Sequence, residues 1–130
     1  MKGKEYEIYI KATSSEIDAL GHVNNINYLK WVQLIADEHW KNISNVSLDS
    51  RIIWVVLRHE IDYFESVLEG DSIRLRTYIG ETYGVKSVRF VEMFKGEKLI
   101  ATSKTIWCLL DKNTQKPIRI SKEILNVLYE

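Results

Sequence analysis

The spacing of hydrophobic and polar positions changes twice along this chain. Residues 6–11, YEIYIK, alternate with a period of two, which predicts a first strand. Residues 13–21 break the pattern and are typical of a loop with capping residues. From Asn25 to about Trp40, apolar residues recur at helical spacing, at Ile26, Leu29, Val32, Ile35, Ala36 and Trp40. This helix also carries apolar residues on its other faces, at Tyr28, Trp31 and Leu34. We therefore expect it to be buried on several sides.

The rest of the chain is rich in strand patterns. Strands are predicted within residues 51–65, 73–79, 88–94 and 99–110, and turn signals lie between them at residues 70–71, 84, 96 and 111–114. Residues 121–129 are typical of a capped terminal helix. Short connections favour antiparallel pairing. The pattern predicts an α+β domain over residues 1–130, in which an antiparallel five-stranded sheet wraps around one long central helix.

Composition and charge exclude several classes of protein. Eighteen basic residues balance eighteen acidic ones, so neither nucleic acid nor a membrane surface is an expected partner. The first eleven residues lack an apolar signal core, and no apolar run reaches the length of a membrane span. We expect a cytoplasmic location. The single cysteine, Cys108, lies in an apolar run and is interpreted as a buried, unreactive residue.

The candidate chemistry is concentrated between the first strand and the helix. One acid (Asp18), one imidazole (His22) and two amides (Asn24 and Asn25) lie within eight residues, directly before the helical pattern. A carboxylate beside a helix N-terminus suits hydrolysis, because it can move a proton or attack while free N–H groups hold an oxyanion. The alternative is that these residues only cap a turn and a helix.

The same stretch carries a resemblance to a known family. Residues 16–28, EIDALGHVNNINY, resemble the pattern D-x-D-x-x-G-H-V-N-N-x-x-Y of hotdog-fold acyl-CoA thioesterases of the 4-hydroxybenzoyl-CoA thioesterase type. Continued to Trp31, it is also similar to the active-site segment of acyl-ACP thioesterases. Weaker matches lie at residues 61–63, 70–71 and 110–119. The chain departs from the pattern at Glu16, where an aspartate is usual, at Gln33, where many relatives have glutamate, and at Ser66, where proline is common.

The resemblance implies a role for each residue of the motif. Asp18 is the expected nucleophile or general base. The backbone N–H of Asn25 is the expected oxyanion donor, and Gly21 supplies a backbone conformation that other residues resist. His22 either belongs to the catalytic set, as in acyl-ACP thioesterases, or only forms a hydrogen bond within the loop. Asn24 has the same two interpretations.

Substrate contacts are expected from the helix and from one strand. Tyr28 is expected to line or support the acyl pocket. Lys86, Ser87 and Arg89 match a strand start that lies near the pantetheine arm of CoA in relatives; the alternative is a solvated strand edge. No metal site is expected, because three scattered histidines lack the spacing of zinc ligands, and no cofactor motif is present.

The leading function is hydrolysis of acyl-CoA to a free carboxylic acid and CoA. The nearest alternative is the same reaction on acyl-ACP, and a different class is a non-catalytic module that binds acyl-CoA. A hotdog hydratase or dehydratase ranks lowest, because its active-site motif is absent. A sheet of five strands leaves edges that must be paired. The resemblance therefore implies a homodimer or homotetramer with sites at the subunit interface.

Overall fold

The computed structural model describes residues 3–130; Met1 and Lys2, which begin the stretch without an apolar signal core, lie outside the described residues. A short 3-10 turn, Ser14–Glu16, interrupts the loop before the long helix. The helices and strands, in chain order, are β1 (Glu5–Lys11), α1 (Asn25–Ile43), α2 (Val46–Asp49), β2 (Ile52–Tyr63), β3 (Ser72–Tyr83), β4 (Lys86–Lys95), β5 (Lys98–Asp111) and α3 (Lys122–Tyr129).

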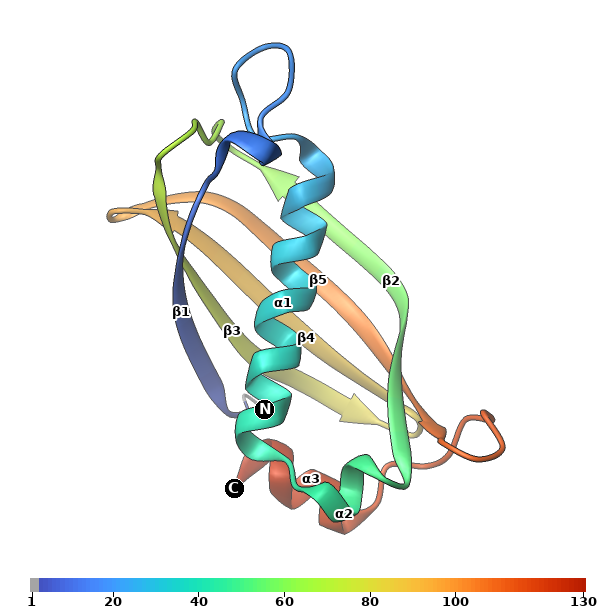
Figure 1. Cartoon of the computed structure of the whole chain (residues 1–130). Helices are drawn as coiled ribbons and strands as arrows, with labels where there is room; N and C mark the ends of the chain where they lie inside the picture. The colour runs from blue at the N-terminus through green and yellow to red at the C-terminus, as the bar shows by residue number, and fades with distance from the viewer. Residues whose placement is uncertain (1–2) are drawn as a thin grey trace.

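The five strands form one antiparallel sheet in the order β1-β3-β4-β5-β2, and this sheet curves around α1 (Figure 1). The predicted α+β architecture is confirmed. Two-residue turns join β3 to β4 and β4 to β5, and each contains a glycine with positive φ, Gly84 and Gly96. Strands β1 and β2 are the two edges. The register between β2 and β5 shifts between Val56 and Arg58, which marks a bulge at Leu57.

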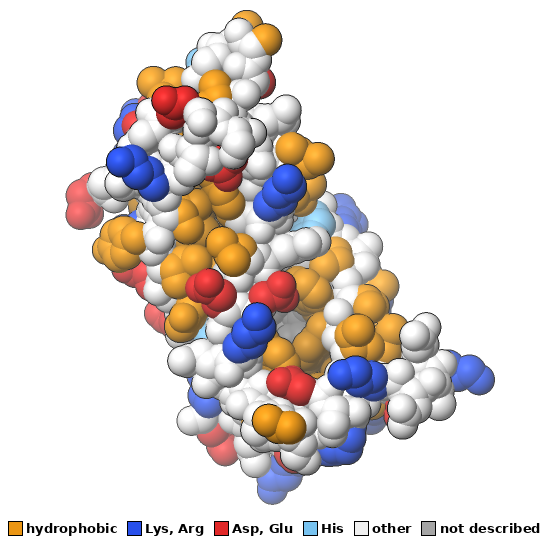
Figure 2. Space-filling view, in the orientation of Figure 1, with side chains coloured by type: hydrophobic (Ala, Val, Ile, Leu, Met, Phe, Trp, Pro, Cys, Tyr) orange, Lys and Arg blue, Asp and Glu red, His pale blue; other side chains and the backbone are white. Residues whose placement is uncertain are grey.

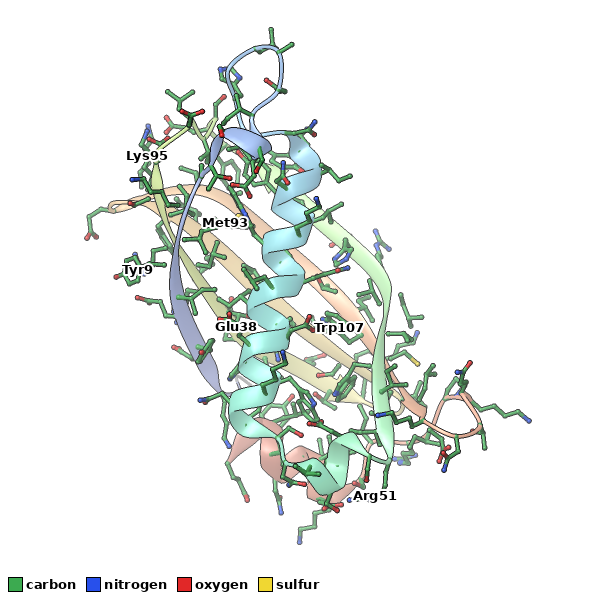
Figure 3. All side chains as sticks on the ribbon, viewed as in Figure 1. Tyr9, Glu38, Arg51, Met93, Lys95 and Trp107 are labelled. Carbon is green, nitrogen blue, oxygen red and sulfur yellow. The ribbon has the colours of Figure 1, made fainter. Side chains whose placement is uncertain are left out.

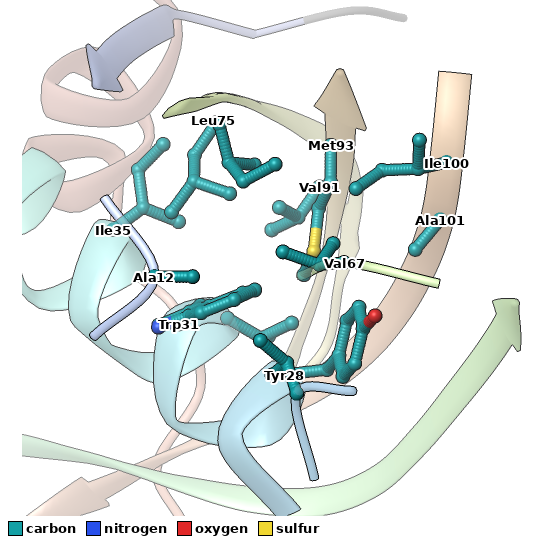
Figure 4. Packing of buried hydrophobic residues seen from close by; sticks show 13 residues of the cluster. Ala12, Tyr28, Trp31, Ile35, Val67, Leu75, Val91, Met93, Ile100 and Ala101 are labelled. Carbon is teal, nitrogen blue, oxygen red and sulfur yellow. The ribbon is translucent and has the colours of Figure 1, made fainter. Parts of the chain in front are cut away.

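Helix α1 packs one face against the concave side of the sheet. Its buried residues recur at helical spacing, and Val32 and Ile35 are fully enclosed. Together with residues from β3, β4 and β5, they form the core beneath the first half of the helix (Figure 4). The expectation that α1 is buried on several sides is wrong for the single chain. Ile26 is 57% exposed and Leu34 39% exposed, because the sheet covers only one side of the helix.

The core beneath α1 consists of two hydrophobic clusters. One lies under the first half of the helix, and the other includes Leu48, Leu109 and residues of α3. Helices α2 and α3 close the sheet at the end where α1 stops (Figure 1). Cys108 is buried, as interpreted from its apolar neighbours. None of the helices in residues 3–130 has the length and apolar character needed to cross a membrane.

Candidate active site

The loop before α1 folds back on itself as a small hairpin that projects from one end of the molecule (Figure 1). Ile17 pairs with Val23, and the Asp18 N–H donates to the His22 carbonyl oxygen at 2.7 Å. Gly21 turns the chain with φ of +81°, a conformation that glycine adopts without steric cost. The geometry agrees with the conformational role expected of this glycine.

The Asp18 carboxylate is held by the backbone of its own loop. Its Oδ1 atom accepts hydrogen bonds from the N–H groups of Leu20 at 2.9 Å and His22 at 3.2 Å. Within residues 3–130, Oδ2 has no such donor, and the residue is only half-buried. The turn-capping interpretation of Asp18 and the catalytic one are therefore compatible, since they use different oxygen atoms.

The start of α1 lies directly after this hairpin. Asn24 is the N-cap, and its Oδ1 accepts a hydrogen bond from the Ile26 N–H at 3.2 Å. Asn25 is the first helical residue and is exposed, and its N–H has no acceptor among the described residues. A free N–H at a helix N-terminus is a suitable donor to an oxyanion.

Glu16 ties the hairpin to the helix. Its Oε1 accepts a hydrogen bond from the Thr13 N–H at 2.8 Å, and its Oε2 accepts one from Trp31 Nε1 at 3.1 Å. Its carbonyl oxygen accepts from the Asn24 N–H at 2.8 Å and from Asn27 Nδ2 at 3.2 Å. The contributions of Trp31 and Asn27 were not predicted, although the motif match that extends to Trp31 was a signal for the first.

The His22 ring contacts the loop between β2 and β3. Its Nδ1 lies 3.5 Å from Ser66 Oγ, at the long limit of a hydrogen bond. The contacts between His22 and Asp18 instead use the His22 backbone, whose carbonyl oxygen accepts from the Asp18 N–H and whose N–H donates to Asp18 Oδ1. The imidazole contact thus joins the hairpin to the loop between β2 and β3.

Tyr28 is a core residue of the single chain, 2% exposed. Its ring centroid lies 5.2 Å from that of Trp31 and 5.0 Å from that of Tyr63 on β2. Burial raises the pKa of the Tyr28 hydroxyl, and a backbone hydrogen bond at Val67 partly offsets this. Tyr28 thus packs between the first turns of α1 and β2.

Ser87 and Arg89 lie at the far end of the helix from Asp18. Both are buried and face α1, and the alternative of a solvated strand edge is wrong for them because β4 lies between β3 and β5. Lys86 is half-buried at the start of the same strand. Ser87 and Arg89 line a pocket of about 220 Å³ that also contacts Ala36, eleven residues after Asn25 along α1. At a rise of 1.5 Å per residue this is about 16 Å. One chain therefore does not bring them to Asp18.

In residues 3–130, no group of three or more His, Cys, Asp or Glu side chains is arranged to hold a metal ion.

The antiparallel sheet curved around one long helix is the arrangement of the hotdog fold. Residues 13–128 match the model of the thioesterase-like superfamily, and the chain belongs to this family. The match confirms the resemblance seen in the motif, and the expected class of enzyme, a thioester hydrolase. No curated protein matches the sequence.

Solved structures share the fold at low identity. A predicted thioesterase from Bacillus stearothermophilus has a TM-score of 0.85 and 22% identity, covering 96% of this chain and 94% of its own. A hypothetical protein from Aquifex aeolicus has a TM-score of 0.85 and 21% identity, with coverages of 95% and 98%. DHNA-CoA thioesterase from Staphylococcus aureus has a TM-score of 0.82 and 21% identity, with coverages of 94% and 85%.

Proposed function

We propose that this protein hydrolyses acyl-CoA thioesters to a free carboxylic acid and CoA. The observation that carries the proposal is the Asp18 carboxylate, with one oxygen free of hydrogen bonds, in a hairpin that leads directly to the free N–H of Asn25. The CoA carrier is suggested by the motif and by the similarity to DHNA-CoA thioesterase.

Two reaction paths are open to Asp18. As a general base, it takes a proton from water, which attacks the thioester carbonyl carbon. As a nucleophile, it attacks that carbon itself and forms a mixed anhydride, which water then hydrolyses. In both paths the carbonyl oxygen becomes an oxyanion, which the Asn25 N–H and the positive end of the α1 dipole stabilise. Collapse of the tetrahedral intermediate breaks the C–S bond and releases the CoA thiolate, which is protonated to the thiol.

A thiol-release assay over acyl-CoAs of graded chain length tests the proposal. We expect Asp18→Asn to lower kcat by roughly 10²–10⁴-fold. The amide oxygen can still accept hydrogen bonds from the Leu20 and His22 N–H groups, so the hairpin should keep its shape. Glu97→Gln, the same chemical change in an exposed turn, is the control and should retain full activity. Undiminished activity in Asp18→Asn would remove Asp18 from the reaction.

Acyl-ACP is the second candidate carrier, favoured by His22 and by the motif match that continues to Trp31. The two carriers can be compared with one acyl group on CoA and on ACP, at equal concentration. A higher kcat/KM for acyl-CoA supports the leading proposal, and a higher value for acyl-ACP replaces it. Tight binding of acyl-CoA without release of thiol would indicate the non-catalytic module instead.

The proposed assembly is a homodimer formed through the free edge of β2. Large hydrophobic side chains on or near this edge are exposed, among them Ile53, Leu57 and Phe64. Helix α1 and β2 run in opposite directions, since Tyr28 contacts Tyr63 and Trp40 contacts Trp54. A two-fold axis through the middle of β2 would thus bring the start of the partner's α1 beside the end of this one. Asp18 of one subunit would then approach the Arg89 pocket of the other.

A further inference from the structure

The pocket beneath the second half of α1 differs from the Asp18 hairpin in the side chains that line it. It opens between α1 and β2, and Figure 2 shows hydrophobic side chains bordering the hollow there. Three tryptophans line it, Trp40, Trp54 and Trp107, and Figure 3 labels Trp107 between the helix and β2. Its volume of about 220 Å³ lies below the range usual for drug-sized ligands. An occupant would therefore be small and largely apolar.

Arg89 brings a positive charge into this pocket without an acidic partner in contact. The side chain is 7% exposed, and its Nη1 atom donates to His39 Nδ1 at 2.8 Å and to Thr77 Oγ1 at 3.1 Å. Burial lowers the pKa of Arg89 to about 10, so the guanidinium remains charged at neutral pH. Within residues 3–130, no carboxylate lies within ion-pair distance of it. A buried charge without a counter-charge is costly to the fold.

The hydrogen-bond partners of Arg89 do not neutralise it. Burial, and then the positive charges of Arg89 and Lys4, lower the pKa of His39 to about 4. His39 is therefore neutral at pH 7, and its Nδ1 acts as an acceptor for the guanidinium. Thr77 is uncharged. The positive charge is thus left for a negative group that enters the pocket.

The tryptophan walls add hydrogen-bond donors without acceptors. Nε1 of Trp54 and Nε1 of Trp107 are buried and have no partner among the described residues. Buried donors in folded proteins normally have an acceptor. Trp40 differs, since its Nε1 donates to Asp49 Oδ1 at 2.8 Å. The pocket therefore has a buried cation and two unsatisfied donors in its walls.

Asp37 limits which anion the pocket can take. It lines the same pocket, is exposed, and acts on Arg89 only through its charge, which partly offsets the lowering of the Arg89 pKa by burial. Its negative charge opposes a doubly charged phosphate more than a singly charged carboxylate. A single negative charge beside Arg89, with the rest of the ligand apolar, fits this distribution.

We propose that this pocket binds the carboxylate of a small apolar acid, an aryl or short alkyl carboxylate. The carboxylate lies against Arg89, where a guanidinium can form two parallel hydrogen bonds, and the apolar body lies against Trp40, Trp54 and Ile52. The ligand has two sources: a free carboxylic acid, or the distal carboxylate of an acyl group whose thioester lies at the partner's Asn25. The second source rests on the proposed function and dimer.

Tryptophan fluorescence measures binding without any turnover. The intact protein is titrated with benzoate and hexanoate, and with benzamide and hexanamide as uncharged matches. We expect saturable fluorescence changes with the acids and at least tenfold weaker binding of the amides. Equal binding of acids and amides, or no binding of either acid, overturns the proposal.

Variants test which groups recognise the charge. We expect Arg89→Met to remove the preference for acid over amide, Trp107→Phe to weaken acid binding severalfold, and Asp37→Asn to tighten it severalfold. Trp40→Phe is the matched control, since its N–H is already bonded to Asp49, and it should keep the preference. If circular dichroism shows that Arg89→Met does not fold, the acid binding of Asp37→Asn and Trp107→Phe tests the proposal. Unchanged acid binding in both of them overturns the proposal.

Paired substrates distinguish the two sources of the carboxylate. The kcat/KM for adipoyl-CoA is compared with that for hexanoyl-CoA, in the unchanged protein and in Arg89→Met. A preference for adipoyl-CoA that is lost in the variant identifies the acyl group as the source. No preference, together with binding of free acids that depends on Arg89, identifies the free acid. If no acyl-CoA is hydrolysed, the proposed function fails, while the fluorescence titration still decides the pocket.

Discussion

Glu16 shows how a single residue can join the Asp18 hairpin to helix α1. Its two carboxylate oxygens bond to different segments, Thr13 in the loop and Trp31 on α1. A hydrogen bond to a charged acceptor is worth more than one between neutral groups. The substitution of glutamate for the usual aspartate thus keeps a carboxylate at this position, and the longer side chain reaches the indole of Trp31.

We predict that Glu16 and Trp31 are energetically coupled. In a double-mutant cycle with Glu16→Ala and Trp31→Phe, the coupling energy measured by urea unfolding should be about 1–2 kcal/mol. The control cycle replaces Trp31→Phe with Trp40→Phe, whose indole bonds to Asp49. That cycle should give a coupling energy near zero. Additive effects in the first cycle would show that the hydrogen bond contributes nothing to stability.

His39 predicts a pH dependence of stability. Its pKa falls from 6.5 to about 4 on folding, chiefly because the ring is buried. Between these values the unfolded chain binds a proton that the folded chain does not, so stability is full above pH 6.5 and falls as the pH drops toward 4. The loss should reach roughly 3 kcal/mol. Burial also lowers the pKa of His59, which acts in the same direction.

Urea unfolding at several pH values between 4 and 7.5 measures this dependence. His39→Gln should remove most of the slope, because a glutamine can still accept a hydrogen bond from Arg89 but does not titrate. His22→Gln, in the projecting hairpin, removes an imidazole and leaves His39 in place, so it should keep the slope. The same slope in the His39→Gln variant would refute the assignment.

At this scale, the sequence predicts local features better than long-range ones. The cluster around Asp18 was predicted because its residues are adjacent in the chain and match a motif. The pairing of Arg89 with His39 was not, because the two residues are fifty positions apart and the contact depends on the packing of α1 over β4. For the same reason, the pattern did not show that Ser87 and Arg89 are buried and lie far from Asp18 of the same chain.

Among the elements, α1 contributes residues to both hydrophobic clusters of the core. We predict that Ile35→Ala lowers the free energy of unfolding by about 2–5 kcal/mol, because Ile35 is fully buried between helix and sheet. Leu34→Ala, one position away but 39% exposed, should cost less than about 1 kcal/mol in the monomer. Chemical denaturation at low protein concentration measures both. Equal costs would mean that another surface covers Leu34.

The periodicity of the sequence predicted the long helix and all of the strands, but not every element or their order. Helix α2 was missed, because four residues are too few to show a helical period. The strand order β1-β3-β4-β5-β2 could not be derived from the pattern, which gives the number and length of strands but not which strands pair across the sheet. The exposed side of α1 was missed because apolar spacing does not distinguish a covered face from an uncovered one.

At the scale of the whole molecule, the two candidate sites lie at opposite ends of α1. The Asp18 hairpin is beside the helix start, and the Arg89 pocket is about 16 Å or more along it. In a single chain the Arg89 pocket is lined by β2 residues, and Asp18 is half-buried. If two chains are related by a two-fold axis at β2, the Asp18 hairpin of each chain would lie beside the Arg89 pocket of the other. The proposed dimer would thus contain two composite sites, each with residues from both chains.

We predict that disrupting the β2 edge separates the subunits and abolishes activity together. Leu57 is 53% exposed and lies at the bulge in the middle of β2. Leu57→Asp should give a monomer by size-exclusion chromatography with light scattering, because a carboxylate would be buried in the interface without a partner. Thiol release should fall in parallel, since Asp18 would lose the opposing pocket. Circular dichroism should remain unchanged.

Tyr9→Asp is the matched control, because Tyr9 is 73% exposed on β1, the other edge of the same sheet. It introduces the same charge at an edge strand that the proposed dimer does not use, so the variant should remain dimeric and active. The Leu57→Asp and Asp18→Asn proteins can also be mixed. If Leu57→Asp is monomeric, the mixture should stay inactive, because no mixed dimer forms. A Leu57→Asp protein that is monomeric and fully active would instead show that one chain forms a complete site, and the composite arrangement would be wrong.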